Sequence, residues 1–98
     1  MSLFRIIEGF ISTREKKKLG YYAFDNTVAA GTDVLYDFGA LRKDVTLETN
    51  KTIRIKFDST SNPAFSVDAG IWKWGEQYSE KMYITTTVAT QLAILANG

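Results

Sequence analysis

The stretch Ile53-Arg54-Ile55-Lys56-Phe57-Asp58 decides the class of fold that this sequence predicts. Its apolar and charged residues alternate one by one, so a β-strand here places the apolar side chains on one face and the charged side chains on the other. A strand with one buried and one solvated face is typical of antiparallel sheets. We therefore expect antiparallel sheet to be the main element of the fold.

The same two-residue period recurs on both sides of this stretch. The apolar residues that are spaced with this two-residue period are Val34, Tyr36, Phe38, Val45, Leu47, Phe65, Val67, Trp72, Trp74, Met82, Ile84, Leu92 and Ile94. Turn-forming residues separate these runs, and Asn50-Lys51 has the composition of a tight hairpin between two of them. About eight short strands with a turn roughly every 8–12 residues predict an all-β fold, an antiparallel β-sandwich of jelly-roll-like form.

The first 20 residues do not follow this period, so we expect a basic N-terminal arm at 1–20 and a β-sandwich domain at 21–98. The apolar side chains of the arm recur with the spacing of one helix face, at Leu3, Ile6, Ile7, Phe10 and Ile11. Their β-branched and aromatic types, together with Gly9, instead favour an extended strand. Both a strand and a short helix stay open for residues 3–17.

The arm also concentrates positive charge. Its five Lys and Arg residues against two Glu residues give a local excess of +3, whereas the whole chain carries +1. The arm residues from which we expect contacts are Phe4, Ile7, Phe10, Arg14, Lys16, Lys17 and Lys18. The basic run fits a solvated loop, an assembly contact or a nucleic-acid contact. Nucleic acid is the least favoured, because the body of the protein is mildly acidic and no aromatic residues interleave the cluster.

The composition of the chain removes most catalytic chemistry. The sequence has no cysteine and no histidine, and therefore lacks thiolate nucleophiles, the usual general base near neutral pH and the commonest ligands of zinc and iron. Its aspartates do not follow the spacing of a calcium loop. We expect no enzyme activity, no cofactor and no metal. No segment has the length of a membrane span, so no membrane contact is expected.

Trp72 and Trp74 are the largest apolar side chains, and their spacing places both on one face of a strand. Together with Tyr78 and Tyr83 they form the candidate interface or ligand platform. Two interpretations stay open for the indoles. They fill the core or a subunit interface, which is the favoured interpretation, or they form an open stacking surface for a sugar.

The order of turns and strands resembles that of a known group of proteins. The segments that carry the resemblance are Ala30-Gly31-Thr32-Asp33, Asp37-Phe38-Gly39-Ala40-Leu41, Asp44-Val45-Thr46-Leu47, the strand 52–57, and the closing Tyr83-Ile84-Thr85-Thr86-Thr87 and Leu92-Ala93-Ile94-Leu95-Ala96-Asn97-Gly98. Over roughly residues 22–98 the sequence resembles the small β-sandwich virion proteins of tailed bacteriophages and related viruses. The resemblance implies a non-enzymatic structural subunit, of the capsid decoration or the tail and baseplate accessory type.

The resemblance also implies partners and a location. We expect a homo-oligomer, for which a trimer is one candidate, that contacts capsid or tail proteins in a virion assembled in the host cytoplasm. Two alternatives of other classes stay open. One is a carbohydrate-binding β-sandwich module that uses Trp72 and Trp74, and the other is an accessory domain of a larger enzyme.

Overall fold

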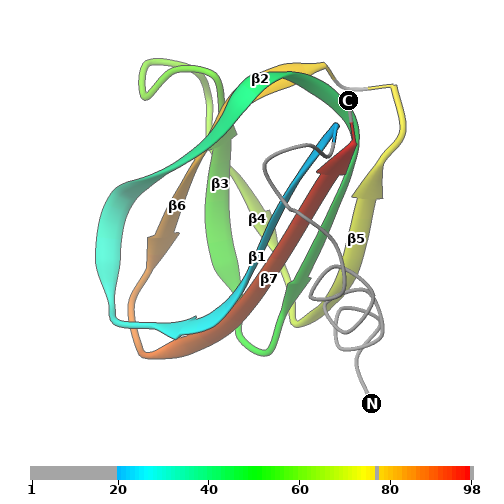
Figure 1. The fold of residues 1–98 in the computed structure, drawn as a ribbon. Coiled ribbons are helices and arrows are strands. Elements are labelled where there is room, and N and C mark those ends of the chain that lie inside the picture. The colour runs from blue at the N-terminus through cyan, green and yellow to red at the C-terminus, as the bar shows by residue number, and fades with distance from the viewer. Residues whose placement is uncertain (1–19, 77, 98) are drawn as a thin grey trace.

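The computed structural model describes residues 20–76 and 78–97, and these residues fold as an all-β protein with seven strands (Figure 1). The strands are β1 (Tyr21–Val28), β2 (Gly31–Thr49), β3 (Ile53–Phe57), β4 (Phe65–Val67), β5 (Gly70–Trp74), β6 (Ser79–Thr86) and β7 (Thr90–Asn97). All strand pairs are antiparallel. The predicted antiparallel β-sandwich is confirmed. No helix of the described residues could cross a membrane.

Strand β2 belongs to two sheets. Its first part, from Gly31 to Arg42, pairs with β6, and its second part, from Lys43 to Thr49, pairs with β7 and β5. We call the sheet with the order β1-β7-β2-β5 sheet A, and the sheet with the order β2-β6-β3-β4 sheet B. Figure 1 shows β2 curving over the top of the molecule from one sheet into the other.

The bend in β2 is built from local backbone features that the sequence marks only as a break. Gly39 has φ 78° and Asp44 has φ 52°, both in the left-handed region. The pairing register shifts between residues 37 and 42, around Gly39, and again between residues 43 and 46, around Asp44. The N–H of Gly39 donates to Asp37 Oδ1 over 2.9 Å, and Arg42 Nε donates to the carbonyl of Phe38 over 2.8 Å. One bulged strand of 19 residues therefore stands where two short strands were expected.

The hairpin predicted at Asn50-Lys51 is wrong. These residues do form a turn, but β2 leads through it from sheet A into β3 of sheet B, and β3 pairs with β4 and β6 instead. The connections from β4 to β5 and from β6 to β7 also cross between the sheets. Turn-forming residues indicate that the chain reverses direction, but they do not say to which sheet it returns.

The core fills the space between the sheets with apolar side chains. The largest fully buried ones are Phe38, Leu47, Ile53, Ile55, Met82, Ile84, Leu92 and Ile94. The alternation of β3 holds, since Ile53, Ile55 and Phe57 are buried whereas Arg54 is exposed and Lys56 is half-buried. Strands β6 and β7 each lie between two other strands, so their backbone groups are covered on both edges.

Aromatic pairs close the side of the sandwich where β1 meets the first part of β2. Tyr22 packs on Phe38 with ring centroids 5.1 Å apart, and Phe24 meets Tyr36 edge to face at 5.0 Å. Burial raises the pKa of both tyrosines above the ordinary value, and the nearby charges of Tyr36 and Asp37 raise the pKa of Tyr22 further. The two tyrosines of this closure are therefore held in their neutral form.

The predicted division into an arm at 1–20 and a β-sandwich domain at 21–98 stays a prediction, because residues 1–19 lie outside the described residues. The expected arm contacts and the choice between helix and strand at 3–17 lie there too. The arm residues named above are Phe4, Ile7, Phe10, Arg14, Lys16, Lys17 and Lys18.

Raising the pH above 10 should destabilise the fold through Tyr22 and Tyr36. Because their pKa values are higher in the folded than in the unfolded state, their contribution is present below the ordinary tyrosine pKa of about 10 and is lost as pH rises through the folded-state pKa. Melting temperatures measured between pH 8 and about pH 11.5 should fall, and less steeply for Tyr22→Phe. An equal fall in the wild type and the variant would contradict the assignment to Tyr22.

Substitution of Gly39 by alanine should cost about 1–2 kcal/mol of unfolding free energy, because a side chain is strained at φ 78°. No atom lies within 4 Å of the added Cβ, so the cost comes from the backbone alone. Urea unfolding measures the change. The control is Gly20→Ala, which also meets no atom within 4 Å and has no positive φ. An equal effect at both positions would contradict the argument.

Candidate functional site

The free edge of β5 is the candidate site. β5 pairs with β2 along Val45–Thr49, and within residues 20–76 and 78–97 no strand pairs with its other side. Four of its five residues are exposed, and Trp74 is half-buried. An edge strand of this kind presents unpaired backbone N–H and C=O groups to any strand that approaches it.

The register of β5 fixes the direction of both indoles. Trp72 lies opposite Leu47 and Trp74 lies opposite Val45, and both of these partners are completely buried. Since residues directly opposite one another share a face of the sheet, both tryptophans lie on the inner face of sheet A. Ile71 points to the outer face, where Glu48 is its partner.

Trp74 closes the gap between the two sheets on this side of the sandwich. Its ring meets Phe57 of β3 edge to face at 5.5 Å and lies 6.1 Å from Phe65 of β4. Phe57 and Phe65 are 6.0 Å apart, so the three rings form one cluster. Phe57 is buried, whereas Phe65 remains 41% exposed. Trp74 therefore serves the core and the edge together.

Trp72 is more open than Trp74. It is 38% exposed, and its Nε1–H donates to the carbonyl of Asp68 over 2.7 Å, a bond that holds the indole in place. The neighbouring Ile71 is 48% exposed. We call the three exposed apolar side chains Phe65, Ile71 and Trp72 the edge patch.

The four aromatic residues that the sequence singles out do not meet in one platform. Tyr83 lies in register with Leu35 and Lys56, on the outer face of sheet B, and Tyr78 is 53% exposed in the connection between β5 and β6. Only Trp72 and Trp74 share the β5 edge. Phe57 and Phe65 could not be predicted as neighbours of Trp74, because their proximity depends on how the two sheets face each other, which no local sequence pattern encodes.

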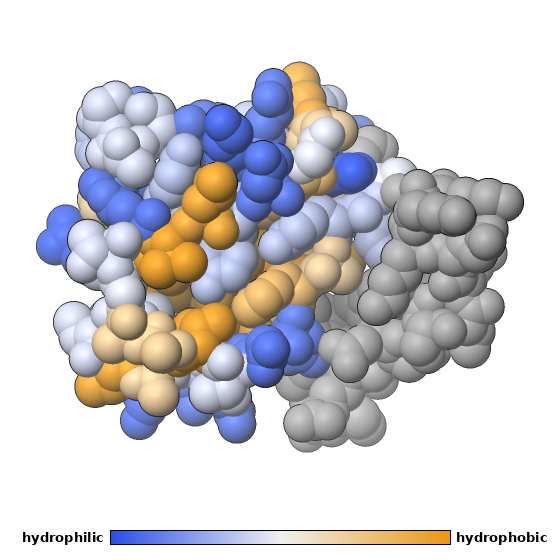
Figure 2. Space-filling model, turned by 60° about the vertical axis from the view of Figure 1, so that its left-hand side comes forward, coloured by the Kyte–Doolittle hydropathy of each residue, from blue (hydrophilic) through white to orange (hydrophobic). Residues whose placement is uncertain are grey.

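A second group of exposed apolar side chains lies at the other side of the sandwich. Val34 is 41% and Leu35 is 49% exposed, in the first part of β2. Figure 2, in which the left-hand side of Figure 1 comes forward, shows apolar residues in a band between hydrophilic ones. This second edge supplies a matched position for controls.

No family model matches this sequence, and the comparison with curated proteins finds no match. Solved structures do share its fold. A cupin-2 domain containing protein from Shewanella frigidimarina is 14% identical, with coverage of 81% of this chain and 72% of that chain and a TM-score of 0.52. Ectoine synthase from P. lautus is 15% identical, with coverage of 84% and 56% and a TM-score of 0.53.

A third neighbour is FeII HppE, 13% identical, with coverage of 85% of this chain and 45% of that chain and a TM-score of 0.57. The chain thus spans about half the length of HppE and of ectoine synthase. At these identities the likeness concerns the fold alone. The fold is that of an all-β sandwich similar to cupin domains.

These neighbours overturn the predicted resemblance to bacteriophage virion proteins. The structures that share the fold include a cupin-2 domain protein, ectoine synthase and HppE. The predicted resemblance is therefore wrong, and so is the function that it implied, a capsid decoration protein or similar structural subunit of a virus particle. The carbohydrate-binding alternative is not favoured by these neighbours either. The physical reason is that short alternating strands separated by turns describe jelly-roll sandwiches of many functions, so strand rhythm identifies the architecture and not the role.

The residues present do not fit a metal ion of the kind that FeII and CoII HppE hold. The sequence has no histidine or cysteine, and the part of the chain that the structure describes contains no group of three or more Asp and Glu residues that could hold a metal. Among the described residues, the buried polar side chains are the hydroxyl groups of Thr46, Thr49, Ser79, Thr86 and Thr90, and the core cluster consists of hydrophobic residues. These donors are poor ligands for iron or cobalt, and we derive no reaction step through a metal.

Truncation of the two tryptophans should separate their roles. Trp74→Ala should lower the free energy of unfolding by about 2–4 kcal/mol, because it opens the cluster with Phe57 and Phe65. Trp72→Ala should cost about 1 kcal/mol, because the indole is more exposed and makes one hydrogen bond. Urea unfolding followed by circular dichroism compares the two. A larger loss for Trp72→Ala would contradict this division.

Proposed function

We propose that this protein is a non-catalytic binding domain that associates with a second copy of itself through the free edge of β5. The observation that carries the proposal is the edge strand itself, which exposes its backbone groups together with Ile71 and Trp72. Pairing two β5 strands would join two copies of sheet A into one continuous sheet. It would satisfy the unpaired backbone groups of β5 and bring its exposed side chains Ile71 and Trp72 into cross-strand contacts.

The sequence of β5 suits antiparallel pairing with its own copy. A two-fold axis at Trp72 places Gly70 opposite Trp74, Ile71 opposite Lys73, and Trp72 opposite its counterpart. Lys73, the one charged residue of β5, then faces an apolar side chain and not a second lysine. The two copies of Trp72 meet as an aromatic pair at the centre.

The size of this edge sets the expected strength of association. A five-residue strand is about 17 Å long, and pairing along it buries less than the roughly 800 Å² per partner of a standard stable interface. We therefore expect a reversible dimer whose population depends on protein concentration. The absence of histidine, cysteine and acidic clusters in the described residues supports a role in binding over one in catalysis.

A glycan-binding platform has less support. Tyr83 lies on sheet B away from the indoles, and Trp74 is engaged by Phe57 and Phe65. One partly exposed indole, Trp72, remains for stacking, whereas a sugar platform as expected from the sequence needs several.

Sedimentation velocity over a range of concentrations tests the proposal. The wild type should shift from monomer to dimer as its concentration rises. Ile71→Lys should weaken the dimer, because it places lysine opposite Lys73 twice in the two-fold interface, at a cost of about 0.2–1 kcal/mol for each pair. Its own cross-strand partner is Glu48, so the monomer fold is not placed at risk.

The same register provides a rescue and a control. Combining Ile71→Lys with Lys73→Glu should restore association, because opposite charges then face each other. The matched control is Leu35→Lys, an equally exposed apolar residue on the second edge, which should leave the dimer unchanged. A wild type that stays monomeric at all concentrations, or a dimer that responds to Leu35→Lys and not to Ile71→Lys, would overturn the proposal.

A further inference from the structure

A small polar hollow lies on the outer face of sheet B. It has a volume of about 190 Å³ and is lined by Thr32, Asp33, Arg54, Lys56, Ala64 and Thr85. These residues come from β2, β3, β6 and the connection between β3 and β4. None of these side chains lies on the β5 edge.

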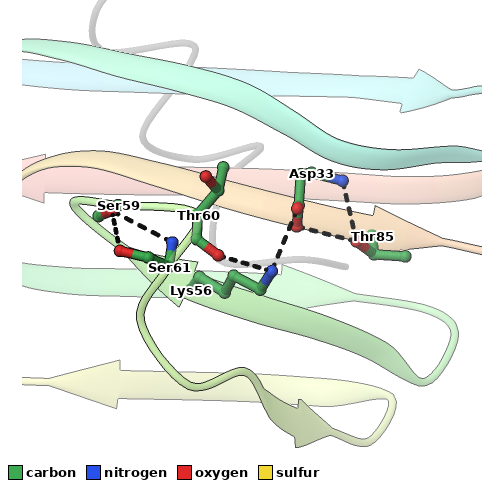
Figure 3. A network of polar contacts seen from close by, with 6 residues as sticks. All are labelled: Asp33, Lys56, Ser59, Thr60, Ser61 and Thr85. Carbon is green, nitrogen blue, oxygen red and sulfur yellow. Dashed lines mark hydrogen bonds and ion pairs between the residues drawn. The ribbon is translucent and has the colours of Figure 1, made fainter.

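Lys56 is held in place inside this hollow. Its Nζ lies 3.1 Å from Asp33 Oδ2 and donates to the carbonyl of Thr60 over 3.0 Å (Figure 3). The side chain of Lys56 is only 22% exposed. A lysine ammonium has three N–H donors, so two fixed contacts orient the group and leave one donor for a ligand.

Asp33 is the residue that positions this lysine, and the backbone is strained to hold it. Its φ of 49° is in the left-handed region, next to the register shift between Gly31 and Val34. Its N–H donates to Thr85 Oγ1 over 2.9 Å, and the Thr85 hydroxyl lies 3.4 Å from Asp33 Oδ1 (Figure 3). Strain of this kind persists where the surroundings fix it, and it gathers at binding sites.

Gly31 contributes to the same local geometry. A Cβ at position 31 would lie 2.7 Å from Val34 Cγ2, so no other residue fits there without movement. A larger residue here would therefore require the Val34 side chain to move, and the bulge between Gly31 and Val34 places Asp33 across β6 from Lys56.

Arg54 supplies a second positive charge. It lies opposite Thr85 of β6 and Ser66 of β4, on the same outer face. Within the described residues its guanidinium has neither a hydrogen-bond nor an ion-pair partner, and the side chain is exposed. With Arg54 and Lys56 against Asp33, the ionisable residues lining the hollow carry a net charge of +1.

We propose that this hollow binds a small oxyanion, a carboxylate or a phosphate group. Arg54 would offer two parallel N–H donors to two oxygen atoms of the anion, and Lys56 would offer its remaining N–H. Asp33 is not a ligand of the anion, since its carboxylate neutralises part of the lysine charge and fixes its position. The volume corresponds to about six water molecules, which limits the ligand to a small one. This proposal does not depend on association through β5.

Amide-resolved NMR titration of the full chain tests the site, with inorganic phosphate in one arm and sodium acetate in the other at constant ionic strength. Saturable shifts are expected at Asp33, Arg54, Lys56 and Thr85. Arg54→Gln should raise the dissociation constant at least tenfold with the rest of the spectrum unchanged, because this side chain has no partner whose loss would affect the fold. The matched control is Lys51→Gln, an exposed cation in the turn between β2 and β3, which should leave binding unaffected.

The two arms distinguish the possible ligands. Saturation by phosphate alone identifies a phosphate group, saturation by acetate alone identifies a carboxylate, and saturation by both supports recognition of oxyanions in general. Shifts that stay linear in both arms, or that persist equally in Arg54→Gln, would overturn the proposal. Either result leaves the sedimentation test of β5 unaffected, so failure of one proposal is distinguishable from failure of the other.

Discussion

The continuity of β2 through both sheets is the constraint on which the rest of the structure depends. One strand of 19 residues supplies the partner of β6 in sheet B and of β7 and β5 in sheet A. Because the same strand is hydrogen-bonded in both layers, the sheets cannot slide past each other without breaking its backbone bonds. Gly39 and Asp44 make this possible, since their left-handed backbone lets the strand turn between layers.

Aromatic side chains then close both open sides of the sandwich. On one side Tyr22 and Tyr36 pack with phenylalanines, and on the other side Trp74 bridges β5 to the opposite sheet. The interior between these closures is filled with apolar side chains. Both proposed binding sites lie outside this interior, on the surface of the protein. They are the edge of β5 and the hollow around Lys56 on the outer face of sheet B.

The alternation at residues 53–57 predicts both the strand and its buried face, because a two-residue period is a local property of extended backbone. The sheet to which each strand belongs is not local. Asn50-Lys51 has the same composition whether the chain returns to its neighbour or crosses to the other layer, so the predicted hairpin failed there. The proposed functions met the same limit, because turn spacing describes the architecture and is shared by proteins with unrelated roles.

The candidate sites divide in the same way. The sequence singles out Trp72 and Trp74 by size and spacing, but only the register with Leu47 and Val45 shows that they face inward at an edge. Asp33, Lys56 and Arg54 carry no motif. Asp33 and Lys56 are 23 residues apart in the chain and meet only because β6 lies between β2 and β3.

The position of β7 between β1 and β2 also governs when the protein can fold during its synthesis. Sheet A has no continuous hydrogen bonding until residues 90–97 insert between two strands made much earlier. While the ribosome still holds that segment, β1 lacks its partner strand and Leu92 and Ile94 are missing from the core. Sheet A therefore cannot form completely before residues 90–97 have left the ribosome, and until then the growing chain must keep its apolar strands from other chains.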